Sequence, residues 1–149
     1  MDETYTLHAK ADLGKRFIAQ LIDGLAAGLL GALVGIFSAT LGGIAGAVYF
    51  LVRDGLELDF MHHRSLGKHV MGLRVVRLDG EAMDLETSLQ RNWMWAISGL
   101  ISASFFGGYL VAIVSTAATV LAIYEIYKVV TDDAGRRWGD EMANTQVVE

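Results

Sequence analysis

The sequence predicts an all-α transmembrane protein, a four-helix bundle of two hairpins with both termini in the cytoplasm and a small cytoplasmic β element. Apolar residues make up 53% of the 149 residues and charged residues only 19%. The mean hydropathy is +0.40, which does not fit an ordinary soluble surface. Residues 17–52 carry a single charge, Asp23, and residues 92–124 carry none. Both segments exceed the ~20 residues that cross a bilayer.

Each apolar segment is too long for one membrane-spanning helix, and each has turn residues near its middle. Residues 38–43 and 102–108 are rich in Ser and Gly, and both stretches end in Gly-Gly, which is typical of a turn. We therefore expect one membrane domain over residues 1–149, with helices near 13–37, 42–58, 90–104 and 109–131, a cytoplasmic loop over 59–89 and a cytoplasmic C-terminal motif over 132–149.

The orientation follows from the cations. All 12 Lys and Arg residues lie before the first apolar segment, between the two segments or after the second. Neither expected hairpin tip has one. By the positive-inside rule, the termini and the central loop face the cytoplasm.

Composition excludes several classes of function. The chain has no cysteine and a net charge of −5, so a thiolate metal site is excluded and a nucleic-acid partner is not expected. No serine has a base at nucleophile spacing. His62, His63 and His69 lack acidic ligands at metal-site spacing and are expected in a solvated loop. We expect no enzyme, no cofactor and no metal.

Two segments of the chain resemble each other. Residues 65–76 and 137–148 align without gaps, 72 positions apart, and both end in Val-Val. Each follows a hairpin, so we expect the two segments to meet on the cytoplasmic face with their Val-Val pairs in neighbouring short strands. Chance similarity is the alternative.

Within these segments, Gly67-Lys68 corresponds to Gly139-Asp140. We expect Lys68 and Asp140 within salt-bridge range of each other or of Arg16. Residues 73–78 are followed by Asp79-Gly80 and then by residues 81–85, which predicts a β hairpin with an Asp-Gly turn.

Polar residues on the first helix form the most informative group. Arg16, Gln20 and Asp23 fall on one narrow helical face. An intramembrane carboxylate must face the protein interior and be paired, hydrated or protonated. Asp23 is therefore either part of an ion or proton site or part of a structural network that Arg16 neutralises. Glu125 lies at a comparable depth and is either a second site residue or a partner of Lys128.

Glycines form a second stripe on the first helix. They are Gly24, Gly28, Gly31 and Gly35. Two Gly-x-x-x-Gly steps allow another helix to approach closely, and on this packing face we expect Gly28→Leu to disrupt packing.

Four motifs in order resemble the RDD family of small integral membrane proteins. They are Arg16-x-x-Ala-Gln-Leu-Ile-Asp23, residues 64–76, Arg91-Asn92 and residues 139–148. The family is named after an arginine and two aspartates. Arg16 and Asp23 match the first two, and Asp140 matches the third better than Asp54. Trp138 and Asn144 depart from the usual pattern.

The resemblance implies a protein of a prokaryotic cytoplasmic membrane, and some members of the family are linked to monovalent cation/proton exchange. Two hypotheses follow. The first is a membrane adaptor that binds other membrane proteins or further copies of itself. The alternative is transport of Na⁺, K⁺ or H⁺ with Asp23 as the coupling carboxylate. They differ in whether Asp23 lines a hydrated cavity or is sealed in dry packing.

Overall fold

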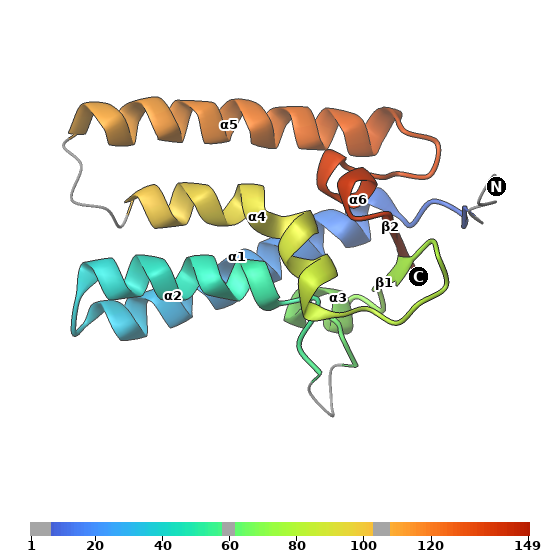
Figure 1. Cartoon of the computed structure of the whole chain (residues 1–149), viewed down its shortest axis with the longest axis horizontal. Helices are drawn as coiled ribbons and strands as arrows, with labels where there is room; N and C mark the ends of the chain where they lie inside the picture. The colour runs from blue at the N-terminus through green and yellow to red at the C-terminus, as the bar shows by residue number, and fades with distance from the viewer. Residues whose placement is uncertain (1–6, 58–61, 103–107) are drawn as a thin grey trace.

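The computed structural model describes residues 7–57, 62–102 and 108–149. The chain is mostly helical, and four long helices run side by side with short elements gathered at one end (Figure 1). The first hairpin consists of α1 (Leu13–Gly35) and α2 (Ala39–Val52), and the second of α4 (Leu85–Ser102) and α5 (Gly108–Thr131). The end that carries the short elements is called the charged end below, because the buried charged residues gather there.

Two segments of these helices, Leu13–Gly35 and Ala112–Thr131, are long and apolar enough to cross a membrane, whereas α2 is a shorter apolar helix. The expected hairpins are present, but some helix boundaries differ from the prediction. Helix α2 starts earlier than expected because the Ser38 side chain accepts a hydrogen bond from the Leu41 amide and caps it. Helix α4 starts earlier because Asp84 accepts from the Thr87 amide at 2.7 Å. The tip of the second hairpin lies outside the described residues.

The two helices of the first hairpin approach closely through glycine. A Cβ atom on Gly42 of α2 would lie 2.4 Å from the Gly31 oxygen and 2.8 Å from the Gly35 Cα. Gly31 and Gly35 are thus packing residues, as predicted. The prediction is wrong for Gly24 and Gly28 within this chain, because a Cβ on either would meet no atom within 4 Å.

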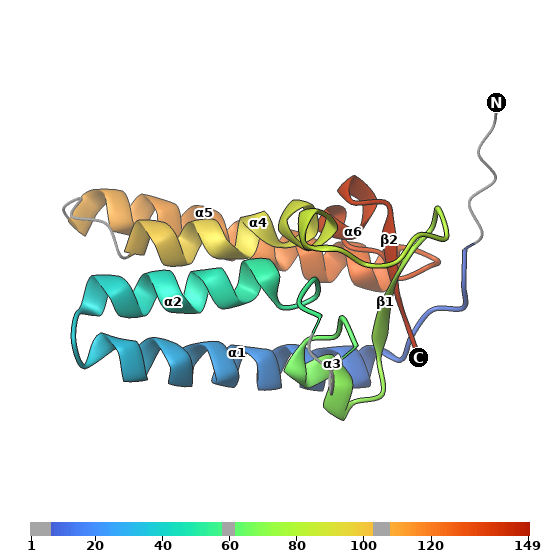
Figure 2. The same ribbon diagram turned by 60° about the horizontal axis from the view of Figure 1, so that its bottom comes forward.

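The charged end contains two short helices and a small sheet (Figure 2). They are α3 (Leu66–Val70), β1 (Arg74–Arg77), α6 (Trp138–Met142) and β2 (Thr145–Val148). Strand β1 pairs antiparallel with β2, and Val75 lies opposite Val147. This confirms the expected pairing. The predicted Asp-Gly hairpin is wrong, because residues 81–84 form no strand and β1 has β2 as its partner instead.

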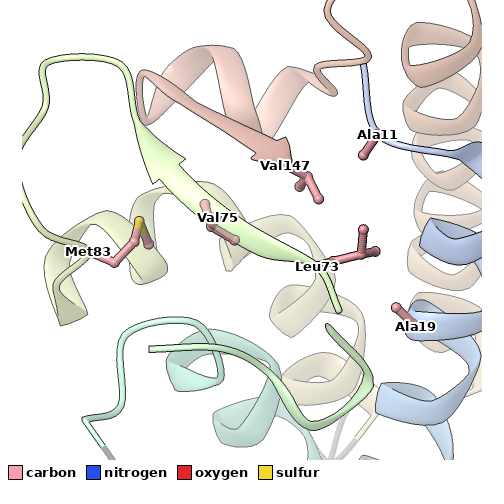
Figure 3. Close-up of a cluster of buried hydrophobic side chains, with 6 residues drawn as sticks. All are labelled: Ala11, Ala19, Leu73, Val75, Met83 and Val147. Atoms are coloured by element: carbon pink, nitrogen blue, oxygen red, sulfur yellow. The ribbon is translucent and has the colours of Figure 1, made fainter. Parts of the chain in front are cut away.

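A small apolar core supports the sheet. Leu73, Val75 and Val147 lie in one cluster with Met83 and with alanines that precede or begin α1 (Figure 3). The sheet is therefore packed against the start of α1, which fixes the charged end relative to the first hairpin.

The internal similarity is visible in the backbone. Helices α3 and α6 have the same length and begin 72 positions apart. Each is followed by a residue in the left-handed conformation, Gly72 with φ 68° and Asn144 with φ 49°. Val75 and Val147, which are equivalent in the alignment, face each other directly. A local two-fold axis therefore passes between these two valines.

Candidate functional site

Buried charged side chains form a continuous network at the charged end. The buried members are Asp23, Arg53, Asp54, Lys68, Arg91, Glu125, Arg137 and Asp140. Burying a charge is costly unless it is paired and hydrogen-bonded. The geometry of each pair therefore shows what the network can do.

Asp23 is sealed at the centre of the first hairpin, with 1% of its surface exposed. It accepts hydrogen bonds from the Gly67 amide at 2.8 Å, from the Tyr49 hydroxyl at 3.0 Å and from Arg53 Nη1 at 3.1 Å. Arg53 also donates to Gln20 at 3.1 Å. The prediction that Arg16 neutralises Asp23 is wrong. Arg53 follows the end of α2 and reaches Asp23 from across the hairpin.

Asp54 is the second anionic centre, and it joins the two hairpins. It accepts from Lys68 Nζ at 2.6 Å and from the Asn92 amide at 3.1 Å. Burial would raise its pKa, but the adjacent cations Lys68, Arg91 and Arg53 hold the pKa of Asp54 well below its usual value. Burial lowers the pKa of Lys68 to about 7, against the opposing effect of Asp54. The expected contact of Lys68 with Asp140 is wrong, because Asp54 takes that place.

Asp140 is the third anionic centre and binds three arginines. Arg91 Nη2 donates to it at 2.5 Å and Arg137 Nε at 3.1 Å, and Arg16 Nη2 lies 3.4 Å away. The expected contact with Arg16 is present. Burial would raise the pKa of Asp140, but the three arginines hold it well below its usual value. Because the arginines come from α1, α4 and the turn before α6, Asp140 ties these elements together.

Glu125 of α5 is the least satisfied carboxylate. Its Oε1 accepts from the Gly139 amide at 3.3 Å, and its Oε2 lies 3.8 Å from Arg137 Nε without a hydrogen bond. The alternative partner, Lys128, binds Glu141 at 2.7 Å instead.

Gly67 and Gly139 are required by close packing rather than by backbone angles. A Cβ on Gly67 would lie 1.9 Å from the Ala19 oxygen, and a Cβ on Gly139 would lie 2.2 Å from the Arg91 oxygen. The contacted positions are 72 residues apart, as are the glycines. The short helices α3 and α6 therefore dock on α1 and α4 in the same way.

A cavity of about 370 Å³ lies between α1 and α5 at the charged end. Its lining includes Arg16, Asp23, Arg91 and Glu125, together with apolar side chains such as Phe17. Asp23 therefore borders a cavity although its own oxygens are occupied by donors.

A sequence model of the RDD family matches residues 10–144, which is most of the chain. The chain belongs to the RDD family. No curated protein and no solved structure matches it. RDD membership and the two apolar segments that are long enough to span a bilayer indicate a membrane protein.

In this RDD protein, two of the three residues matched to the family's name, Arg16 and Asp140, bind each other. The third, Asp23, binds Arg53 instead. Asp54, the weaker match, is also fully buried and binds Lys68. All three aspartates thus belong to one network.

Five residues of the network were not among the predicted site residues. They are Arg53, Asp54, Arg91, Asn92 and Arg137. Arg53, Asp54 and Arg91 lie at an end of an apolar segment, where a charge is ordinarily exposed at the membrane interface. The motif Arg91-Asn92 was a usable signal for α4. For Arg53 and Asp54 the signal was their adjacent opposite charges after an apolar helix.

Proposed function

We propose that this RDD protein is a membrane adaptor, a multi-pass module of a prokaryotic cytoplasmic membrane with both termini in the cytoplasm. The cation-free hairpin tips support this orientation. A reporter fused after Glu149 tests it, because a periplasmic signal would contradict the orientation.

The state of Asp23 carries the proposal. Its carboxylate accepts three hydrogen bonds from protein donors and is paired with Arg53. A carboxylate that couples ion movement must exchange its ligands, and an uncompensated charge left behind is costly. Asp23 therefore serves as a lock that fixes α3 and the end of α2 against α1.

The outer face of α1 is where an adaptor would meet another helix. Gly24 and Gly28 are exposed on this face, and neither has a neighbouring atom in the space that a Cβ would take. Small residues at this spacing allow close contact between helices in lipid. The occupant would be another membrane protein or a second copy of this chain.

The test compares Gly28→Leu with Ala117→Leu, a similar enlargement on an exposed position of α5. Association is measured by Förster transfer between labelled full-length chains in liposomes and by cross-linking in the membrane. We expect Gly28→Leu to reduce association without lowering the unfolding midpoint. Equal association in both variants would contradict the use of this face.

Transport is the second candidate, and Glu125 is the observation that favours it. Glu125 lines both the 370 Å³ cavity and a second cavity of about 260 Å³ between α4 and α5. Its Oε2 has no hydrogen-bond donor among the described residues. If the protein moves Na⁺, K⁺ or H⁺, Glu125 is a better coupling group than Asp23.

Proton flux driven by a cation gradient in proteoliposomes decides between the two candidates. Transport predicts flux in the wild type that Glu125→Gln abolishes. Asp23→Asn is the comparison. Loss of flux in this variant alone, while it remains folded, would show that Asp23 and not Glu125 is the coupling group. Absence of cation-dependent flux in the folded wild type favours the adaptor.

A further inference from the structure

The cavity between α1 and α5 has an apolar mouth and a charged floor. Phe17 and Ile126 line it, yet 69% and 61% of their surfaces are exposed. Arg91 lines it too, but only 1% of Arg91 is exposed. Because Phe17 and Ile126 lie in the apolar segments that are long enough to span a bilayer, the mouth faces lipid.

The aqueous side of the cavity is closed by the chain. Lys10 Nζ donates to the Val130 and Asp132 oxygens at 2.9 and 3.0 Å. Arg16 Nη1 donates to the Gly135 oxygen. These bonds join the start of α1 to the residues that end and follow α5. A ligand therefore enters sideways from the bilayer rather than from the water at the charged end.

Arg91 has unused donor groups. Its Nη2 binds Asp140, while its Nη1 and Nε have no hydrogen-bond acceptor among the described residues. A carboxylate oxygen of Asp54 lies 3.7 Å from Nε, beyond hydrogen-bond distance. A buried guanidinium donor without an acceptor is costly, so the floor of the cavity is prepared for an anionic oxygen.

The charge around the cavity favours an anion as well. The lining contains five cationic side chains, Arg16, Arg53, Lys68, Arg91 and Arg137, and two carboxylates, Asp23 and Glu125. Two further carboxylates, Asp54 and Asp140, are buried beside them. With every group charged, the network keeps one positive charge in excess. One anionic ligand would balance it.

The depth of the cavity distinguishes a lipid head group from a helix. On α1 its lining begins at Leu13 and goes no deeper than Asp23, and on α5 it runs from Glu125 to Val130. A partner helix would need a groove along the whole length of α1 and α5. A space confined to the charged end lies where a bilayer places its head groups.

We propose that this cavity binds the phosphate of an anionic membrane phospholipid. The phosphate oxygens accept hydrogen bonds from Arg91 Nη1 at the floor, with Arg16 nearby. The acyl chains pass out through the mouth and lie along the exposed apolar surfaces of α1 and α5. Guanidinium groups bind phosphate through charge-assisted hydrogen bonds. This proposal does not depend on helix association or on ion transport.

The experiment measures lipid retention by full-length protein reconstituted into nanodiscs of phosphatidylcholine or of phosphatidylcholine with phosphatidylglycerol. The protein is then extracted in mild detergent and analysed by native mass spectrometry. Ile126→Trp fills the mouth, and Ile123→Trp is the matched control. The two isoleucines are on the same helix and are similarly exposed, at 61% and 62%, but Ile123 does not line the cavity.

We expect one retained phosphatidylglycerol molecule in the wild type and in Ile123→Trp, and roughly tenfold less in Ile126→Trp, because the larger side chain occupies the mouth that the acyl chains would use. Arg91→Lys keeps the charge beside Asp140 but removes the free Nη1 donor. It should lower phosphatidylglycerol retention with little change in the unfolding midpoint.

Three results would overturn the proposal. The first is equal retention of phosphatidylcholine and phosphatidylglycerol. The second is the same retention in the Ile126→Trp and Ile123→Trp variants, both folded by their unfolding midpoints. The third is displacement of the lipid by millimolar inorganic phosphate, which would identify a site for a free anion instead. Retention that survives inorganic phosphate supports a lipid, because the acyl chains add binding energy that phosphate lacks.

Discussion

In the first half of the chain the short helix α3 is held by a carboxylate of α1, whereas in the second half α6 is held by a carboxylate of α5. Gly67 donates its amide proton to Asp23, and Gly139 donates its amide proton to Glu125. Arg53 and Glu125 occupy positions 72 residues apart. The two glycine amides are therefore bound by carboxylates at positions that are not equivalent, because the position equivalent to Glu125 carries the cation that binds Asp23.

The two halves also differ in how tightly their hairpins close. Asp23 accepts three hydrogen bonds of 3.1 Å or less, while Glu125 accepts one at 3.3 Å and has an oxygen without a donor. Gly42 brings α2 against α1, whereas the α4–α5 hairpin leaves a cavity of about 260 Å³. Among the described residues, the first hairpin is therefore the more closely packed half.

Removing the charge of Asp140, which binds arginines from both halves of the chain, should give the largest loss of stability. Asp140→Asn leaves Arg91 and Arg137 buried without their main counter-charge, which should cost about 3–5 kcal/mol of unfolding free energy. Thermal unfolding in detergent measures it. Glu141→Gln is the control, because Glu141 pairs with the partly exposed Lys128 and should cost less than about 1 kcal/mol. Equal losses of unfolding free energy in the two variants would show that the contact between the halves does not depend on buried charge.

The asymmetry between the halves is tested by removing one carboxylate charge from each. Asp23→Asn removes the carboxylate that Arg53 binds and leaves Arg53 with Asp54, at 3.9 Å, as its counter-charge, which should cost about 3 kcal/mol. Glu125→Gln should cost about 1 kcal/mol, because the hydrogen bond that Glu125 accepts from Gly139 is long, at 3.3 Å. The two unfolding midpoints are compared under the same conditions. If Glu125→Gln lowers stability more than Asp23→Asn, the first hairpin is not the half that depends more on its carboxylate.

Because the two halves have the same backbone arrangement, we expect substitution of Gly67 and of Gly139 to lower stability by the same amount. Gly67→Ala and Gly139→Ala each place a methyl group against a backbone oxygen and should cost roughly 1–3 kcal/mol through overpacking. Gly24→Ala is the control in open space within a helix, and it should stabilise by about 0.5–1 kcal/mol. A tolerated Gly139→Ala beside a harmful Gly67→Ala would break the equivalence.

The last expected effect concerns pH and the first half of the chain. Burial lowers the pKa of Lys68 to about 7 from its ordinary 10.5. The unfolded chain then binds the extra proton between these values, so the contribution of Lys68 to stability rises as the pH rises from about 7 to 10.5. The groups that act on it are Asp54, Arg53, Arg91 and Asp23. Lys68→Met should remove this part of the pH dependence, measured as the difference between the two unfolding profiles.

The sequence predicted the parts of the fold that follow from periodicity and hydropathy. The two hairpins and the pairing of Val75 with Val147 were predicted because apolar length and a repeated segment are local signals. The helix starts at Ala39 and Leu85 were missed because capping by Ser38 and Asp84 extends a helix beyond its apolar run.

The charge partners could be predicted only in part. Arg16 with Asp140 followed from the repeat, whereas Asp23 was assigned to Arg16 because the two lie on one helical face. A partner on the same helix is the simplest expectation, but Arg53 reaches Asp23 from the other helix of the hairpin. Which of several nearby cations pairs with a carboxylate depends on three-dimensional packing, and the sequence pattern does not contain that information.

The pairing of β1 with β2 also sets an order of assembly. Val75 finds its partner 72 residues later, after both helices of the second hairpin. During synthesis the first hairpin can close on Asp23 by itself, because the hydrogen-bond partners of that carboxylate, Tyr49, Arg53 and Gly67, all precede Lys68. The arginines can gather around Asp140 once residue 140 has been made, and the sheet forms last. The charged end is thus completed late, and chains that stop before Asp140 leave Arg91 without the carboxylate that it binds.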